Sequence, residues 1–265
     1  MKISVSNIAW DKENDGLMYA FLAENGIQGL EIAPTRLFEN PYDNLETAHI
    51  YAAMLKNRYG LEVSSMQSVW YGIDKNIFAG REDRRFLTEY TKKAILFAES
   101  MGIKNIVFGC PKNRNMSRQT QENYQIALEF FRRLGDFARR HNTVLAMEAN
   151  PSIYNTNFLN FTKDACEFVK QADSPGLGVN ADMGTVIYNK ENPHVVKTYK
   201  NIINHIHISA PSLAPVYPCR ELETLKKALG KTDWDKYLSL EMKNPGDIEK
   251  VKETILFVKR FFDGI

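Results

Sequence analysis

Residues 98–108, AESMGIKNIVF, join the end of a helical pattern to a short β-branched run. Residues 81–102, which overlap the start of this stretch, carry apolar side chains at three- and four-residue intervals, which is typical of a helix buried on one face. Gly102 ends that pattern, as a left-handed helix C-cap requires, and residues 104–110 then have the composition of a buried strand. The same junction recurs at residues 23–32 and 56–63. The chain therefore repeats a unit of helix, glycine and strand.

Eight candidate strands emerge when this pattern is followed in both directions. They lie at residues 2–8, 28–34, 61–69, 104–110, 142–150, 176–184, 204–210 and 237–243. The clearest helices between and after them are 81–102, 121–141 and 247–265. Alternating strands and helices imply parallel neighbours joined by right-handed crossovers.

Eight units of about 33 residues match the roughly 250-residue (β/α)8 barrel. An open doubly wound sheet is the alternative, but no GxGxxG opens the first unit, and no shift of composition marks a domain boundary. We therefore expect the α/β class and one (β/α)8 TIM-barrel domain over residues 1–265.

Composition narrows the classes of function. The 265 residues are 44% apolar and 25% charged, as in ordinary globular proteins, and the net charge of +2 comes without a dense basic tract. Charge thus gives no support for nucleic-acid binding. Residues 1–15 lack the apolar core of a signal peptide, and no run reaches the roughly 18 residues of a membrane span, so we expect a cytoplasmic protein without membrane contact. Cys110, Cys166 and Cys219 are odd in number and lack CxxC spacing, which argues against disulfides and structural zinc.

Four polar residues mark the carboxyl ends of the last four predicted strands, namely Glu148, Asp182, His207 and Glu241. They are separated by 34, 25 and 34 residues, about one strand-helix unit each. In a (β/α)8 barrel this end carries the active site, and side chains there converge on the barrel axis. Three carboxylates buried together would cost many kcal/mol without a counter-charge, so a divalent cation is the natural partner. An oxygen-rich set with one nitrogen favours Mn²⁺, Mg²⁺ or Co²⁺.

His205 lies on the same strand face as His207 but one layer deeper. We predict that it is a barrel-interior histidine bonded to a hydroxyl or carboxylate, and not a metal ligand.

The four motifs resemble a known family. "ME" at Glu148, "AD" at Asp182, "HIH" at His207 and "LEM" at Glu241 are similar to the xylose isomerase-like TIM barrels, also called the sugar phosphate isomerase/epimerase or AP endonuclease family 2 superfamily. The resemblance implies one divalent ion, Mn²⁺ in the first place with Co²⁺, Mg²⁺ or Zn²⁺ as alternatives, on two neighbouring oxygens of an open-chain sugar. It also implies that Glu148 and Glu241 are the catalytic acid and base.

The activity implied by the resemblance is isomerisation or epimerisation of a sugar, sugar phosphate or keto-polyol through a metal-stabilised enediolate. Ketose 3-epimerases of the superfamily carry an acidic residue, a histidine and an arginine where this chain has Tyr154, Thr185 and Leu213. A standard free-ketohexose 3-epimerase is therefore not matched, and other small-molecule sugars or polyols remain open as substrates. Homo-oligomers are common in this family, but the sequence identifies no interface patch.

Other residues near the predicted barrel mouth are candidates for substrate binding: Glu31, Gln67, Lys112, Arg114, Tyr154 and Lys243. Basic side chains there could hold a phosphate or carboxylate, although charged loops are common without a ligand. Trp70, Tyr71 and Tyr188 could wall a sugar or simply pack loops.

Three functions other than isomerisation or epimerisation are the alternatives. A keto-polyol dehydratase of the inosose dehydratase type would use the same enediolate, and a non-catalytic sugar-binding barrel would keep the metal ligands without turnover. A nuclease of the DNA-repair branch is disfavoured, because the third and fourth strands end in "SVW" and "FGC" where that branch needs histidines.

Overall fold

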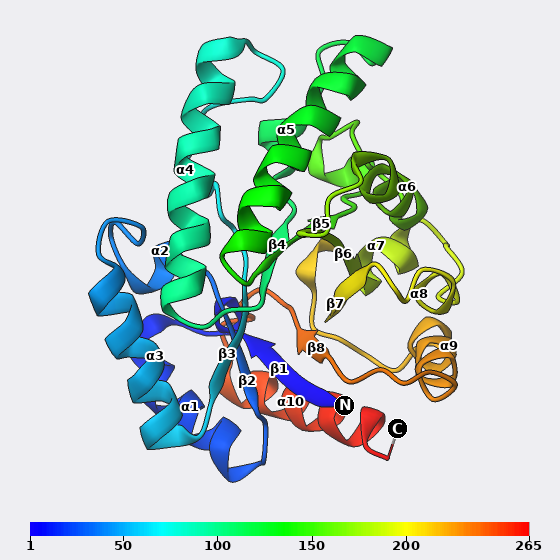
Figure 1. Ribbon diagram of the computed structural model, residues 1–265. Coiled ribbons are helices and arrows are strands. Elements are labelled where there is room, and N and C mark those ends of the chain that lie inside the picture. The colour runs from blue at the N-terminus through cyan, green and yellow to red at the C-terminus, as the bar shows by residue number, and fades with distance from the viewer. Residues whose placement is uncertain (265) are drawn as a thin grey trace.

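Eight parallel strands close into a barrel in the computed structural model, which describes residues 1–264 (Figure 1). The strands are β1 (Lys2–Ser6), β2 (Gly29–Ile32), β3 (Glu62–Met66), β4 (Asn105–Phe108), β5 (Val144–Glu148), β6 (Leu177–Asp182), β7 (Ile203–Ile208) and β8 (Tyr237–Leu240). Each pairs with its neighbours in sequence, and β8 closes the ring on β1 with Ser239 aligned to Ser4. The predicted (β/α)8 fold is confirmed. The observed strands are shorter than predicted and lie within the predicted ranges, except that β7 begins one residue earlier.

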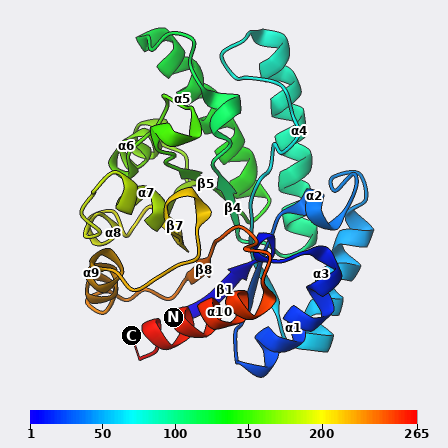
Figure 2. The ribbon, with the colours of Figure 1, turned by 180° about the vertical axis from the view of Figure 1, so that it is seen from behind.

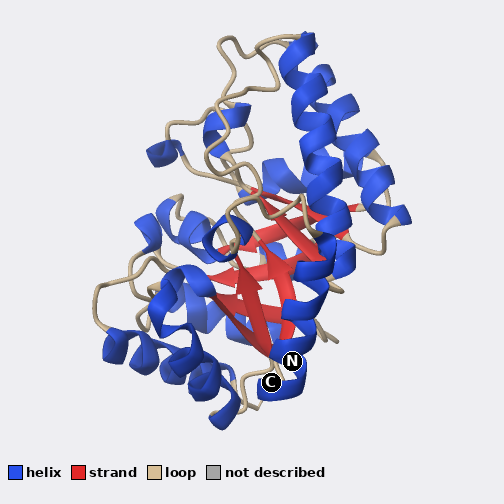
Figure 3. Cartoon of the chain, turned by 90° about the vertical axis from the view of Figure 1, so that its left-hand side faces the viewer, coloured by secondary structure: helices blue, strands red, loops and turns tan. Residues whose placement is uncertain are grey.

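Helices cover the outside of the barrel, as the two opposite views and the side view show (Figures 1, 2 and 3). They are α1 (Asp15–Glu24), α2 (Pro34–Leu37), α3 (Leu45–Tyr59), α4 (Arg81–Ser100), α5 (Gln121–Arg140), α6 (Thr162–Ala172), α7 (Met183–Tyr188), α8 (Val195–Thr198), α9 (Arg220–Leu229) and α10 (Ile248–Phe262). The three helices predicted most clearly from sequence correspond to α4, α5 and α10. Short 3-10 turns follow β4 (Pro111–Arg114), β5 (Ser152–Tyr154) and β7 (Pro211–Leu213).

The junction that suggested the fold has the expected backbone. Gly102 takes a left-handed φ of 74°, and its N–H donates to the Glu99 carbonyl at 3.0 Å. Ile103 then bonds back to Ala98 at 2.8 Å before β4 begins. A side chain at position 102 would strain this turn, so glycine allows the helix to end and the strand to start within four residues.

The two faces of the strands differ in polarity. Outward residues such as Leu145, Met147 and Leu240 are fully buried against the helices, and each contributes about 1.5–3 kcal/mol through burial. Inside the barrel, hydrogen bonds cross between strands: Ser4 meets Ser64 at 2.5 Å between hydroxyl oxygens. This interior is more polar than the branched apolar filling usual in such barrels. A polar interior can support charged groups at the rim above it.

The start of β1 and the end of α10 lie close together in both ribbon views (Figures 1 and 2). Among the described helices, none combines the length and apolar character needed to cross a membrane.

Candidate metal and catalytic site

The four strand-end residues predicted from the sequence meet at one end of the barrel. Glu148 and Asp182 end β5 and β6, His207 is the penultimate residue of β7, and Glu241 directly follows β8. One oxygen or nitrogen from each of them lies within 4.8 Å of the others. We call these four residues the acidic cup. Their approach follows from topology, because carboxyl ends of neighbouring parallel strands share one rim.

His207 is fully buried and faces the cup through Nδ1. This atom lies 3.1 Å from Glu148 Oε1 and 3.1 Å from Glu241 Oε2, yet the angles do not make a hydrogen bond with either oxygen. A buried polar atom without a partner is costly. Its position among carboxylate oxygens is the position of a metal ligand.

Hydrogen bonds fix the Glu148 carboxylate from two sides. Asn180 donates to Oε1 at 2.6 Å, and Asn150 donates to Oε2 at 3.1 Å. Gly109 on the neighbouring loop leaves room, because a Cβ there would lie only 2.7 Å from Glu148 Oε2. Burial raises the pKa of Glu148, but the close approach of His207 and the hydrogen bonds from Asn150 and Asn180 outweigh it, and the net pKa falls below the usual value.

Asp182 is both a rim residue and the N-cap of α7. Its Oδ1 accepts the Thr185 N–H at 2.6 Å, and the Ser209 hydroxyl donates to Oδ2. Burial, together with the charges of Glu148 and Glu241, raises the pKa of Asp182 to about 7. The ion-free cup thus resists full ionisation.

Glu241 is the least restrained member of the acidic cup. Among the described residues its carboxylate has no hydrogen-bond donor with good geometry, and only His207 approaches it as a counter-charge. Burial raises its pKa, and the charges of Glu148 and Glu31 add to the shift against the opposing effect of His207. Glu241 is therefore free to reorient or to exchange a proton.

A second layer lies below the cup and is built on Glu31, which is fully buried. Its carboxylate accepts from Gln67 at 3.1 Å and lies 3.0 Å from His207 Nε2 and 3.2 Å from His205 Nε2. Burial alone would raise the pKa of Glu31, but the two histidines hold it well below the usual range. Glu31 was expected to contact substrate; instead it supports His207 from beneath. His205 lies in the interior, as predicted.

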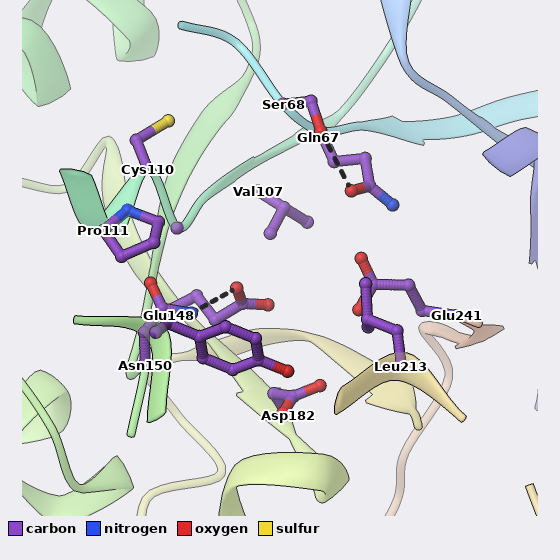
Figure 4. Close-up of a pocket in the computed structure, with 12 residues that line it drawn as sticks. Gln67, Ser68, Val107, Cys110, Pro111, Glu148, Asn150, Asp182, Leu213 and Glu241 are labelled. Atoms are coloured by element: carbon purple, nitrogen blue, oxygen red, sulfur yellow. Dashed lines mark hydrogen bonds between the residues drawn. The ribbon is translucent and has the colours of Figure 1, made fainter. Parts of the chain in front are cut away.

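A cavity opens above the acidic cup, and we call it the mouth cavity (Figure 4). Glu148, Asp182 and Glu241 turn toward its centre, with Gln67 on the opposite side. Tyr154 lines it as well, and burial beside the three carboxylates raises the pKa of this phenol to about 12. Gln67 and Tyr154, two of the residues predicted to contact substrate, thus line this cavity, and Leu213 and Cys110 line it too.

The three basic residues that were predicted to contact substrate do not line the mouth cavity. Arg114 is fully buried, and its guanidinium donates to the carbonyls of Gly109, Phe158 and Glu148 and to the Asn150 side chain at 2.5–3.2 Å. It holds the loops together and has no face toward substrate, which corrects that expectation. Lys112 and Lys243 are exposed and do not line the mouth cavity. Lys112 instead pairs with Asp74 at 3.0 Å.

Sequence reasoning missed the residues that position Glu148. Asn150 lies two residues after Glu148, and Asn180 lies two residues before Asp182, so the two-residue period of a strand places each on the same face as a cup residue. This two-residue period is the sequence signal that could have identified Asn150 and Asn180. The contact of Gly109 with the cup depends on a loop, and no local pattern indicates it.

The donor set fits a divalent cation. Three carboxylates and one imidazole nitrogen converge, the nitrogen lacks another partner, and oxygen-rich sets of this kind suit Mn²⁺, Mg²⁺ or Co²⁺. The site defined so far is an oxygen-rich cup at the carboxyl rim of a (β/α)8 barrel.

Comparison with known proteins identifies the family to which this barrel belongs. The sequence matches the family described as xylose isomerase-like TIM barrel over residues 19–261. The chain belongs to that family. No match was found among curated protein sequences.

Three solved structures illustrate the likeness. The 3-keto-D-glucoside 4-epimerase YcjR from E. coli has a TM-score of 0.78 at 18% identity, with 98% of this chain and 99% of that chain covered. D-psicose 3-epimerase from Clostridium cellulolyticum H10 gives 0.82 at 15% identity, with 99% and 98% covered. The probable 3-DHS dehydratase AsbF from Bacillus anthracis gives 0.75 at 18% identity, with 98% and 99% covered. At these identities the likeness shows the shared fold.

Proposed function

We propose that this protein is a divalent-metal-dependent isomerase or epimerase of a sugar or keto-polyol. The observation that carries the proposal is the convergence of four ligand atoms within 4.8 Å around a His207 Nδ1 atom that has no hydrogen bond. Membership of the xylose isomerase-like family and the fold shared with two sugar epimerases support it. We further propose Mn²⁺ as the ion and the cytoplasm as the location.

Glu148, Asp182, His207 and Glu241 would hold the ion. When bound, it supplies positive charge beside the carbonyl and neighbouring hydroxyl oxygens of a substrate, which makes the adjacent carbon-bound proton more acidic.

The two glutamates would move the proton. Asn150 and Asn180 donate to Glu148, which favours its ionised form and fits it to remove a proton from carbon. Glu241 lies across the cup without such donors, so it can deliver a proton to the substrate or accept one. Delivery to the opposite face of the same carbon inverts the centre, and delivery to the neighbouring carbon interconverts aldose and ketose.

The test is metal analysis of the purified protein followed by incorporation of solvent deuterium into ketoses and keto-polyols. We expect one divalent ion per chain, and deuterium at the carbon next to the carbonyl. Glu148→Gln and Glu241→Gln should each lower the exchange rate at least about 10²-fold, as loss of a general base or acid does.

Two other results would decide against this function. Net loss of water from a keto-polyol would assign a dehydratase, which the same carboxylates can support. Stoichiometric metal without exchange of any substrate proton would assign a sugar-binding barrel.

A further inference from the structure

The mouth cavity adjoins a second depression, which we call the side groove. Its walls are the loop after β3, with Trp70, Tyr71 and Ile73, and the turn after β4, with Lys112. Ser68, Cys110 and Pro111 line both spaces. The two spaces are therefore adjacent, and a molecule whose reacting carbon lies over the acidic cup would reach the groove with a substituent that crosses these three residues.

The groove is preformed and does not depend on a mobile loop. Asn113 donates its amide to the carbonyls of Ile73 at 2.8 Å and Lys75 at 2.7 Å, which ties the two walls together. Trp70 is fixed by a bond from its indole N–H to Thr91 at 2.9 Å and by edge contact with Phe108 at a centroid distance of 4.5 Å. Rigid walls lower the entropy cost of binding a ligand.

The seam between the two spaces has an unusual backbone. Ser68 has a φ of 57° and Cys110 a φ of 44°, both in the left-handed region that residues with a side chain seldom adopt. Strain of this kind is commonly found at ligand sites, where the surrounding structure maintains it. Both residues lie in the lining that the mouth cavity and the side groove share.

One large aromatic side chain in the side groove is exposed and can contact a ligand. Tyr71 is 72% exposed, whereas Trp70 beside it is 2% exposed and forms the groove floor. An exposed aromatic ring next to a buried one offers a surface on which another ring can stack.

The charges of the two spaces disfavour a phosphate. In the described part of the chain, no lysine or arginine lines the mouth cavity, and three carboxylates do. Lys112 is the cation of the side groove, and it already pairs with Asp74 at 3.0 Å. A phosphoryl group beside the ion-loaded cup would therefore find no unpaired side-chain cation in this lining, and a neutral substrate does not need one.

Resting on the proposed isomerase or epimerase function, we infer that the substrate is a neutral keto-glycoside whose ring-shaped substituent occupies the side groove against Tyr71. A free ketose fills the mouth cavity only and leaves Tyr71 exposed. The ring could be an aryl group or a second sugar, since both present an apolar face. The chemistry stays a proton exchange: a carbon-bound proton leaves to a carboxylate, and a solvent proton is delivered, with no redox change.

The test measures binding and exchange separately on ion-loaded protein. The probes are 3-keto-D-glucose, its methyl and phenyl glycosides of one anomeric configuration, a 3-keto disaccharide and D-fructose 6-phosphate. Calorimetry gives Kd, and solvent deuterium incorporation gives kcat/KM.

We expect the phenyl glycoside or the disaccharide to bind about tenfold more tightly than the methyl glycoside, as burial of one ring predicts. The tighter binder of the two shows whether the ring is an aryl group or a second sugar. Tyr71→Ala should bring that preference to within about twofold. Tyr217, which is 50% exposed and lines neither space, gives the matched control, and Tyr217→Ala should keep the preference.

Equal affinity for all neutral probes, stronger binding of the phosphate, no binding at all, or a preference that survives Tyr71→Ala would each overturn the inference. Its failure is distinct from failure of the proposed function. Preferential binding without deuterium exchange would support the groove and reject the isomerase, whereas exchange with equal affinity would do the reverse.

Discussion

Nε2 of His207 lies 3.0 Å from Oε2 of Glu31, and Nδ1 of the same ring lies among the carboxylates of the acidic cup. A carboxylate at one nitrogen keeps the proton there, which leaves the lone pair of the other nitrogen available. With an ion in the cup, Glu31 would thus favour the tautomer that a metal ligand needs. Its own position is fixed by bonds from Ser65 and Gln67.

Glu31→Gln should therefore weaken binding of the divalent ion by roughly 10–100-fold, the usual effect of losing such a support. The amide keeps the shape of the side chain but loses the charge that holds the proton on Nε2. Calorimetric titration with Mn²⁺ gives the affinity, and ¹⁵N chemical shifts of His207 report the tautomer.

Glu62→Gln is the control for that experiment, because Glu62 lies on the same sheet with its side chain 46% exposed and paired with Lys56 at 2.9 Å. Its ion affinity should equal that of the wild type. An unaltered affinity and tautomer in Glu31→Gln would show that Glu31 only fills space.

Much of this site could be predicted from the sequence, because the four cup residues are determined by strand ends. Strand period and parallel topology bring Glu148 and Asp182 to one rim whatever the loops do. Glu31 was predicted to contact substrate at the mouth, but it lies beneath the cup against His207, and the register between β2 and β3 shifts at Leu30 and Glu31. Such a stagger depends on closure of the barrel as a whole.

The buried position of Arg114 could not be predicted from a local sequence pattern either. Its charge and loop position suggested a ligand contact, but Arg114 is the last residue of the 3-10 turn after β4 and is fully buried. The guanidinium then reaches carbonyl groups up to 44 residues away in sequence. Only the tertiary structure brings those acceptors together.

Arg114→Met should destabilise the fold by about 4 kcal/mol, the range for removing one partner of a buried charged network. The carbonyls of Gly109, Glu148 and Phe158 would lose their donor. For a chain of this size the loss corresponds to a decrease in Tm of roughly 10 °C, measured by calorimetry.

Lys112→Ala, two residues away, should change Tm by no more than about 3 °C, because an exposed pair with Asp74 contributes under about 1 kcal/mol. Equal Tm changes in the two variants would contradict the structural role of Arg114.

Gly109→Ala should impair catalysis while leaving the fold intact. The added Cβ would lie 2.7 Å from Glu148 Oε2 and 3.3 Å from Asn150 Oδ1, so the carboxylate must move. Displacement of a reacting group by about 1 Å can cost about 10²-fold in rate, and we expect that loss in deuterium exchange. Circular dichroism should match the wild type.

Gly16→Ala in α1 is its matched control, because nothing lies within 4 Å of a Cβ at that position. The exchange rate should be unchanged, and stability should rise by up to about 1 kcal/mol from helix propensity. A Gly109→Ala protein with full exchange activity would mean that Glu148 does not need its present position.

The stability of the ion-free protein should fall as pH rises from 4 to 8, because the pKa of Asp182 is raised to about 7. In this window the unfolded chain releases the Asp182 proton first and the folded chain retains it, so ionisation at higher pH favours unfolding. Asp182→Asn removes the charge but keeps an oxygen that can cap α7 at Thr185. We therefore expect the free energy of unfolding of the variant to exceed that of the wild type by about 2 kcal/mol at pH 8, or roughly 5 °C in Tm, and by much less at pH 4.

Adding Mn²⁺ at pH 8 should reverse this order of stability, because the ion neutralises the wild-type cup and the variant has lost a ligand. Thermal denaturation at both pH values, with and without the ion, checks all four states, and a wild type that remains the more stable without ion at pH 8 would show that the cup carries no excess negative charge.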